Sequence, residues 1–354
     1  MKNNYSVIMS LTWAVTASPL AVSQSTPSEF AEMSFFELFE ESIDDPLKGN
    51  QNESPWTFAL QYKMVEFEGY LDGTDKLSYD EVLWEGPSET RTDKNFPVVP
   101  SVITQDVTVF ALGYEINEDW RIHLSVPHVE QNTDHISIVP GYKEFSIGTS
   151  GIGDVVVTAT QRLFSTPNSN WWLSMGISLP TGSIDEEGDT PRAPGNQQLP
   201  YTMQLGSGTY DIPLEVSYHS LSSHDWSTSF SANIRTGKND RAYRLGNNYS
   251  LSGRYRFHML PTLRPFVGID IQYSDSIHGA DKSLLVDSPF PYPASITNPD
   301  LYGGTSIGAS IGFSWTIADK YRLVGEFGKP VYQNLNGPQP KQDWHSSFQL
   351  SRTF

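Results

Sequence analysis

From Trp56 to Phe354 the chain alternates apolar and polar side chains with a period of two, and this pattern constrains the fold more than any other feature. Such a period is typical of β-strands whose two faces meet different surroundings. Residues 306–317 follow it without a break, with Ile, Ala, Phe and Trp on one face and Ser, Gly and Thr on the other. The pattern therefore predicts an all-β chain over residues 56–354.

The alternating segments number about twelve, and the connections between them differ in length. We place the strands at 56–70, 102–116, 120–139, 151–165, 171–183, 208–221, 226–237, 248–258, 263–277, 305–317, 321–335 and 343–354. Every second connection is short, so short turns and long loops gather at opposite ends. This asymmetry is typical of antiparallel up-and-down barrels of the bacterial outer membrane, whose turns and chain ends face the periplasm.

Aromatic residues gather beside the short turns, on the apolar face of the strands. They also stand at both ends of the predicted barrel, where Trp56 begins the first strand. Indole and phenol rings prefer the boundary between hydrocarbon and water, so a girdle of them is expected where strands leave a membrane. The predicted inner girdle comprises Tyr114, Trp120, Trp171, Tyr218, Trp226, Phe257, Trp315, Tyr321 and Phe354. A transmembrane barrel explains this ring better than the alternative of a secreted β-sandwich.

Composition excludes several other classes. The chain has 41 acidic and 23 basic residues and a formal charge of -18, which disfavours a nucleic-acid partner. It has no cysteine, so disulfides, thiolate metal sites and cysteine nucleophiles are excluded. No apolar run reaches the roughly 18 residues of a membrane-spanning helix.

The N-terminus reads as an export signal. Lys2 precedes a short apolar stretch from Val7 to Val15, and the small residues Ala21 and Ser23 fit a cleavage site. We predict a signal peptide at 1–23 and a periplasmic segment at 24–55. Within that segment, residues 30–47 form a predicted short amphipathic helix that could pack on the inner mouth of the barrel, bind a periplasmic partner or act as a linker.

Glycine-containing stretches in the middle of the chain resemble a known family. They are Gly151-Ile-Gly-Asp154, Leu179-Pro-Thr-Gly182 and Leu205-Gly-Ser-Gly-Thr-Tyr-Asp211. In this order, over about residues 150–275, they resemble outer-membrane barrels named as putative transporters of the meta-pathway of phenol degradation. The resemblance implies a passive channel. Independently of it, we expect these glycines to supply positive φ and sharp bends at the loops.

Charged residues opposite the girdle face are predicted to line the lumen, because an arginine facing the hydrocarbon midplane would cost about 2 to 4 kcal/mol. These lumen or selectivity candidates are Arg121, Arg162, Arg235, Arg254, Arg256, Arg264, Arg322, Asp154, Asp211, Glu215, Asp270 and Glu326. They could pair as struts or select solutes, and Arg235, Arg254 and Arg256 would then favour anions.

Catalytic and cofactor signals are weak. The eight histidines share no metal-ligand spacing, and only Asp134 with His135 and His278 with Asp281 and Ser283 combine acid, base or nucleophile types. We therefore predict no enzyme activity, no cofactor and no metal site. The acids Asp185, Glu186, Glu187 and Asp189 are expected in a solvated outer loop or at a cation bridge to lipopolysaccharide.

The sequence as a whole predicts a passive channel for small polar or amphipathic solutes in the outer membrane of a Gram-negative bacterium. A barrel with a filled structural or ligand-binding lumen is the alternative. Expected partners are outer-membrane lipid and lipopolysaccharide, an unspecified small solute, and the barrel-assembly machinery, which would engage the last strand ending in Phe354.

Overall fold

The computed structural model describes residues 54–354 apart from 223, 261 and 319. The predicted signal peptide at 1–23 and nearly all of the predicted segment at 24–55, with its helix at 30–47, lie outside the described residues. Within the described part, no helix is long and apolar enough to cross a membrane.

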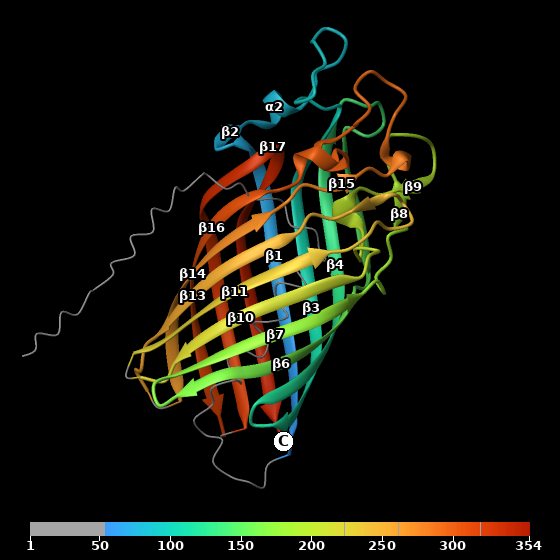
Figure 1. The fold of residues 1–354 in the computed structure, drawn as a ribbon. Coiled ribbons are helices and arrows are strands. Elements are labelled where there is room, and N and C mark those ends of the chain that lie inside the picture. Colours follow the sequence, from blue (N-terminus) through green and yellow to red (C-terminus); the bar gives the residue numbers. More distant parts are fainter. Residues whose placement is uncertain (1–53, 223, 261, 319) are drawn as a thin grey trace, which may run out of the picture.

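Eleven strands form one antiparallel sheet that closes into a barrel, and their tilt across it is visible in Figure 1. Closure follows from pairing between the first strand and the last, which a two-sheet sandwich would lack. The strands are β1 (Trp56–Gly73), β3 (Val98–Asn117), β4 (Trp120–Ser137), β6 (Val155–Thr166), β7 (Ser169–Leu179), β10 (Asp211–Ser220), β11 (Asp225–Arg235), β13 (Asn248–Arg256), β14 (Leu263–Ser274), β16 (Gly304–Ile317) and β17 (Tyr321–Thr353).

The last strand, β17, contributes two arms to the wall. Residues 321–335 pair with β16, and residues 335–353 pair with β1. Leu335 is opposite both Gly304 and Gly73, so the chain reverses direction near this residue at the end of the barrel that carries the long loops. Counted by arms, the wall agrees with the prediction of about twelve strands.

Two predicted connections are largely strand. The stretch between the predicted strands at 120–139 and 151–165 contains β5 (Glu144–Ile152), which pairs with the upper half of β4. The stretch 336–342 belongs to β17. The expected long loops at these two places are therefore wrong, and the wall rises higher on this side than predicted.

The outer surface carries an apolar belt with a defined lower and upper edge. At the lower edge the predicted girdle residues point outward, and the rings of Trp56 and Tyr114 and of Tyr218 and Trp226 lie 4.7 and 4.6 Å apart. On β4 the outward-facing residues are apolar from Trp120 to Val126 and polar from His128 to Asp134. The same change occurs on β3, where Asp106 is paired with Glu130 of β4.

A seam in the wall is closed by a loop. β6 and β7 end together at the pair Val155 and Leu179, whereas β5 continues beside β4 above them. Residues 205–207 pack against this seam, and the Asp154 carboxylate accepts hydrogen bonds from the backbone N–H groups of Gly182 (2.9 Å) and Ser207 (2.8 Å).

The seam explains most of the glycines noted in the sequence. A Cβ on Gly182 or Gly206 would lie within 2.6 Å of the facing backbone, so both positions require glycine for close approach. Of the five glycines assigned to positive φ, only Gly208 adopts it, at 69°. The expectation of positive φ is therefore wrong at the other four.

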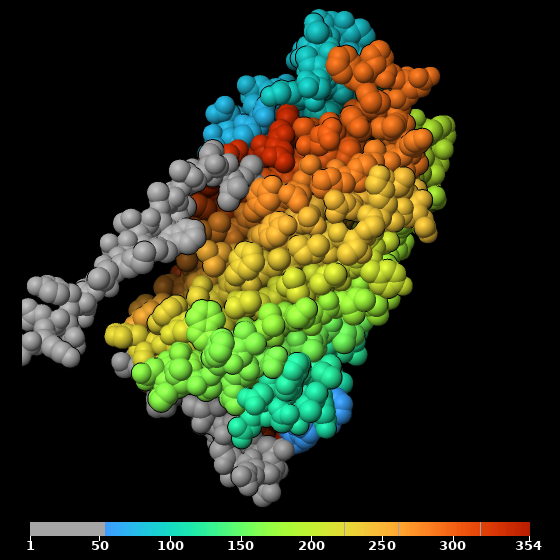
Figure 2. Space-filling view, in the orientation of Figure 1, coloured from blue at the N-terminus to red at the C-terminus, as the bar shows by residue number. Residues whose placement is uncertain are grey.

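Long loops cover the outer end of the barrel, shown at the top of Figures 1 and 2. We call residues 74–97 the first outer loop, 180–210 the third, 236–247 the fourth and 275–303 the fifth. Their short elements are β2 (Asp75–Leu77), α2 (Tyr79–Val82), β8 (Glu187–Asp189), β9 (Asn196–Gln198), η1 (Tyr201–Met203), β12 (Tyr243–Arg244), β15 (His278–Gly279), η2 (Lys282–Leu284), η3 (Ser295–Thr297) and η4 (Pro299–Leu301).

Candidate functional site: the lumen and its outer cap

The inward-facing positions of the strands carry the predicted lumen charges. Arg121, Arg235, Arg256, Asp154, Asp211 and Glu215 are buried, and Arg162, Arg254, Arg264, Arg322, Asp270 and Glu326 are partly buried. Their outward neighbours along the same strands include exposed girdle residues such as Trp120 and Tyr321. This separation follows from the two-residue period of a strand.

Several of these charges form ion pairs between strands. The most enclosed pair joins Arg235 Nη1 to Asp211 Oδ2 at 2.6 Å, with both side chains fully buried. Arg254 Nη2 lies 2.9 Å from Glu326 Oε2 across the lumen wall. Arg235 and Asp211 join neighbouring strands, whereas Arg254 on β13 and Glu326 on β17 are separated by β14 and β16. Both pairs are struts, an arrangement that the sequence left open.

Other predicted charges pair with residues that the sequence analysis did not select. The Arg256 and Arg264 guanidinium groups lie 3.5 and 3.3 Å from the carboxylate of Asp225. Near the short turns, Arg162 lies 2.8 Å from Asp119. The alternation pattern could not find these acids, because they stand at strand ends, where the period is lost.

A polar cavity of about 70 Å³ lies inside the barrel, mainly against the wall formed by β11, β13 and β14. Glu215, Arg254, Asp270 and Glu326 line it together with serine and glutamine side chains. The lumen thus brings together four of the twelve predicted charges. Asp154 is not among them, because it holds the seam.

The opposite wall of the lumen carries an apolar strip that the sequence analysis missed. The strip is formed by inward residues that are at most 2% exposed: Ala59, Val65 and Phe67 of β1, Ile103, Val107, Val109 and Ala111 of β3, and Val129 of β4. The sequence did contain a signal for this strip, since the first three predicted strands hold apolar residues on both faces.

Gln105 interrupts the apolar strip at mid-height. Its side chain is buried between Ile103 and Val107, and neither amide atom has a hydrogen-bond partner among the described residues. Gln131, paired opposite it on β4, donates from Nε2 to Thr149 Oγ1 at 2.8 Å. On β1 the buried side chains of Gln61 and Lys63 likewise lie between Ala59 and Val65, so the strip is apolar with polar groups set between its members.

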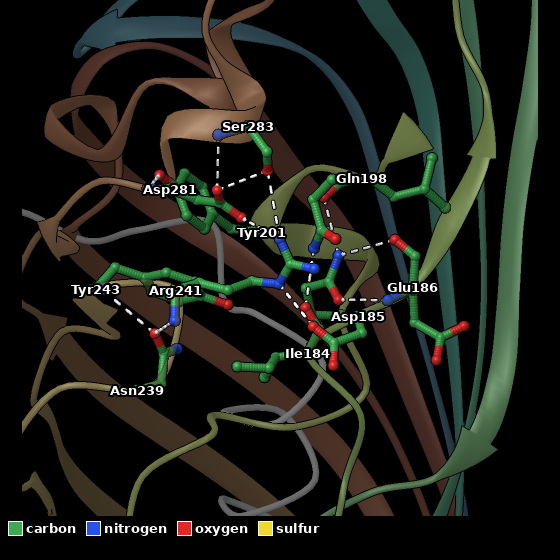
Figure 3. A network of polar contacts seen from close by, with 12 residues as sticks. Ile184, Asp185, Glu186, Gln198, Tyr201, Asn239, Arg241, Tyr243, Asp281 and Ser283 are labelled. Atoms are coloured by element: carbon green, nitrogen blue, oxygen red, sulfur yellow. Dashed lines mark hydrogen bonds and ion pairs between the residues drawn. The ribbon is translucent and has the colours of Figure 1, made fainter. Parts of the chain in front are cut away.

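Three outer loops are fastened together above the lumen by Arg241 of the fourth outer loop (Figure 3). Its Nε atom lies 2.8 Å from Asp185 Oδ1 in the third outer loop, and its Nη1 atom lies 3.2 Å from Asp281 Oδ2 in the fifth. The backbone N–H of Asp281 also donates to Tyr201 Oη at 3.0 Å. We call these joined loops the outer cap.

An apolar core also joins the three loops of the outer cap. Tyr201, Tyr243, Leu245, Ile277, Leu284 and Tyr302 form a buried cluster that draws on the same three loops. The rings of Tyr201 and Tyr243 lie 4.8 Å apart at a steep angle. Burial raises the pKa of both phenols above its ordinary value of about 10.

The two catalytic combinations noted in the sequence do not assemble. Asp134 and His135 are adjacent on β4 and point to opposite faces; His135 stacks on Phe145 at 4.6 Å. In the fifth outer loop the Ser283 hydroxyl donates to Asp281 at 2.6 Å, and that carboxylate also binds Arg241. Among the described residues, no group of three or more His, Asp or Glu is placed to hold a metal ion.

The acidic run of the third outer loop is partly engaged within the protein. Asp185 pairs with Arg241, and the Tyr142 hydroxyl donates to Asp189 Oδ1 at 2.6 Å. These contacts join the loop to its neighbours. A cation bridge to lipopolysaccharide stays a prediction.

Comparison with one outer membrane channel of known structure supports the fold, and two further barrels are similar at lower scores. The chain superposes on an outer membrane channel from Pseudomonas putida F1 with a TM-score of 0.54 and 14% identity, covering 88% of this chain and 100% of that one. The translocator domain of the autotransporter NalP from Neisseria meningitidis gives 0.44 and 6%, covering 92% and 96%. A Pseudomonas aeruginosa FadL homologue gives 0.41 and 10%, covering 95% and 100%.

Comparison by sequence adds no assignment. No family model matches the chain, and no curated protein matches it. The resemblance to transporters named for the meta-pathway of phenol degradation therefore stays a prediction.

Proposed function

We propose that this protein is a passive outer-membrane channel for small polar or amphipathic solutes. The observation that carries the proposal is a closed barrel with an apolar belt outside and charged, hydroxyl and amide groups inside. Water-facing proteins rarely expose a continuous apolar surface of this extent. A membrane barrel requires one, because its outer face contacts hydrocarbon.

The edges of the belt support this orientation in a membrane. Aromatic rings stand at the lower edge beside the short turns and both ends of the barrel wall, and outward polar side chains begin above Val126 on β4. Aromatic residues at an interface and polar residues beyond it match the depth profile of a bilayer. The shared fold with an outer membrane channel is consistent with this assignment.

The alternative of a filled structural lumen is supported by the ion pairs that cross between strands. A narrow barrel can use such pairs as struts, since side chains occupy much of its interior. A polar cavity between them still leaves room for a solute path once the outer cap moves. We therefore favour a channel whose conduction is limited by its cap.

The test is conduction by the purified full chain in a planar lipid bilayer. We expect discrete current steps in potassium chloride and uptake of small sugars or amino acids by proteoliposomes. Heat-modifiable migration on gels would establish that the barrel is folded. A folded, inserted protein that neither passes ions nor admits solutes would overturn the channel and leave the filled barrel.

A further inference from the structure

The polar cavity against β11, β13 and β14 exists because small residues line it. Ser231, Ser250 and Ser310 line it from β11, β13 and β16. Gly268 of β14 contributes no side chain, and a Cβ built there would lie against Ser310 Oγ. The outward neighbours of these residues, such as the exposed Leu251 on β13, belong to the apolar belt. The cavity therefore lies at the height of the belt.

The charged side chains around the cavity are already engaged. Arg254 Nη2 lies 2.9 Å from Glu326 Oε2. Lys63, Glu215 and Asp270 each have an interaction partner as well. A solute that bound to one of these charges would have to displace that partner, and breaking a shielded charge pair is costly. Charge therefore gives the cavity little preference for a free ion.

Several neutral side chains around the cavity, in contrast, have no partner. Among the described residues, nothing forms a hydrogen bond with the hydroxyl groups of Ser231, Ser250 and Ser310 or with the side-chain amide of Gln272. Ser310 is only 7% exposed, so its hydroxyl is withdrawn from bulk water. A buried polar group without a partner is costly, so these groups favour an occupant that forms hydrogen bonds with them.

Solutes that carry hydroxyl groups match these side chains. A serine hydroxyl and a glutamine amide both donate and accept hydrogen bonds, and so does every hydroxyl group of a polyol. A polyol also carries no charge that the cavity would have to neutralise. The cavity volume is about 70 Å³, which at about 10 to 15 Å³ for each water-sized group corresponds to about five to seven such groups. Glycerol, with three carbons and three hydroxyl groups, is of this size.

We propose that this cavity is a binding site for small neutral polyols of about the size of glycerol. The hydroxyl groups of Ser231, Ser250 and Ser310 and the amide of Gln272 hold the solute, and Gly268 leaves the space for it. The inference deepens the proposed function by naming a solute class for the lumen, and it rests on that function for the claim that such solutes cross the barrel. The site itself can be tested without any current.

Equilibrium binding tests the chemistry of the site. Saturation-transfer NMR on the full chain in detergent micelles measures the binding of glycerol over a series of concentrations. We expect saturable binding, and we expect erythritol, a polyol with one more carbon, to displace glycerol. The competitors 1-propanol, sodium acetate and ethylammonium chloride should each need at least a fivefold higher concentration than erythritol, because they lack the additional hydroxyl groups.

Two variants test the location of the site. Gly268→Ala fills space beside Ser310, and the double variant Ser250→Ala with Ser310→Ala removes two hydroxyl groups while leaving the space. Each variant should weaken glycerol binding at least fivefold. Gel mobility with and without heating shows that each variant is folded.

Each variant has a matched control. Gly253→Ala controls for Gly268→Ala, since its added Cβ would lie 3.7 Å from the outward residue Ile269 and would not enter the cavity. Ser306→Ala with Ser314→Ala controls for the loss of two hydroxyl groups, because these buried serines of β16 do not line the cavity. Both controls should bind glycerol as the unaltered chain does.

The outcomes distinguish this site from the channel itself. Conduction without saturable glycerol binding would show that the cavity holds water only, and would overturn the site while leaving the channel. Saturable binding without conduction in a bilayer would overturn the channel and leave the site. If acetate or ethylammonium displaced glycerol as well as erythritol does, the charged groups would hold the solute and the polyol assignment would be wrong. Equal weakening in the controls would overturn the location.

Discussion

At the scale of single residues, inward arginines of this barrel are paired with carboxylates on other strands. Arg235 with Asp211 and Arg254 with Glu326 are largely shielded from water, so their attraction is weakly screened. A buried pair contributes little compared with a well-packed apolar pair, but the loss of one partner leaves a buried charge uncompensated. This reasoning predicts large penalties for single substitutions and small ones for matched double substitutions.

Replacing Arg235 by Met should lower the free energy of unfolding by about 3 to 5 kcal/mol, because Asp211 then stays buried without its main counter-charge. Urea unfolding from lipid vesicles, followed by tryptophan fluorescence, measures the change. Arg264→Met is the control and should cost about 1 kcal/mol or less, since its pair with Asp225 is partly exposed. Adding Asp211→Asn to Arg235→Met should recover much of the loss. Equal penalties for Arg235→Met and Arg264→Met would contradict this account.

The same pairing bears on ion selectivity. Each of the three arginines predicted to favour anions has a carboxylate within 3.5 Å, which reduces the field it projects into the lumen. We expect neutralising Arg254 and Arg256 together to shift the reversal potential in a potassium chloride gradient only slightly toward cation preference. A full reversal from anion to cation preference would show that these residues act as a selectivity ring and not as struts.

At the scale of elements, the sequence predicted the strands well within the apolar belt and poorly above it, where the outer face is polar. β5 was missed because its outward residues, including Glu144 and Ser146, are polar, whereas Phe145 and Ile147 point inward. In β5 the polar side chains therefore face outward and the apolar ones inward, which is the reverse of the pattern in the belt. The turn within β17 was likewise hidden, because residues 336–342 lack the pattern of the belt. Long-range contacts, such as those of Arg241 with two distant loops, leave no periodic pattern in the sequence from which they could be predicted.

Gly206→Ala should destabilise the seam, because its Cβ would lie 2.5 Å from Asp154 Oδ1 and 2.6 Å from the Gly182 carbonyl oxygen. Overpacking of this kind costs about 1 to 3 kcal/mol. Limited proteolysis within residues 180–210 should become faster as the third outer loop detaches. Gly253→Ala on β13 is the matched control, since the nearest atom to its added Cβ is 3.7 Å away. Unchanged proteolysis of the Gly206→Ala variant would show that the seam tolerates the added methyl group.

Arg241→Gln should loosen the outer cap by removing the charge that joins Asp185 to Asp281. We expect the open probability of single channels to rise about threefold to tenfold, where tenfold corresponds to about 1.4 kcal/mol. Lys238→Gln makes the same change of charge at an exposed position in the same loop and should have little effect. If both variants raise the open probability equally, the net charge of the loop controls the cap, and the contacts of Arg241 with Asp185 and Asp281 do not.

Alkaline pH should also release the outer cap, through Tyr201 and Tyr243. Folding raises the pKa of both phenols, so the packed state favours their neutral forms. The stabilisation is therefore complete below the unfolded pKa of about 10 and is lost as the pH rises above it. Phenolate absorbance near 295 nm and loop proteolysis should change together in this range. Tyr201→Phe combined with Tyr243→Phe should move the loss of the cap to higher pH.

At the scale of the whole molecule, polarity changes in two directions, along the height of the outer surface and across the lumen. Outside, the belt ends at aromatic rings below and polar side chains above, which sets the depth at which it would sit in a bilayer. Inside, the apolar strip on β1, β3 and β4 lies across the ring from the polar cavity against β11, β13 and β14. The first division concerns the membrane and the second concerns what the lumen holds, so substitutions on the two faces should have separable effects.

Ile311→Arg tests the membrane assignment directly. Ile311 points outward from the middle of β16, is 64% exposed, and is paired with the outward residues Val267 and Phe327. In phospholipid vesicles the variant should lose about 2 to 4 kcal/mol of stability, because an arginine at the midplane must be taken into hydrocarbon. Ile317→Arg, near the aromatic girdle, is the matched control and should cost about 1 kcal/mol or less. In a soluble protein, an exposed Ile311 replaced by Arg would change stability by at most about 0.5 kcal/mol. A penalty at Ile311 no larger than that at Ile317 would therefore contradict the placement of the belt in a bilayer.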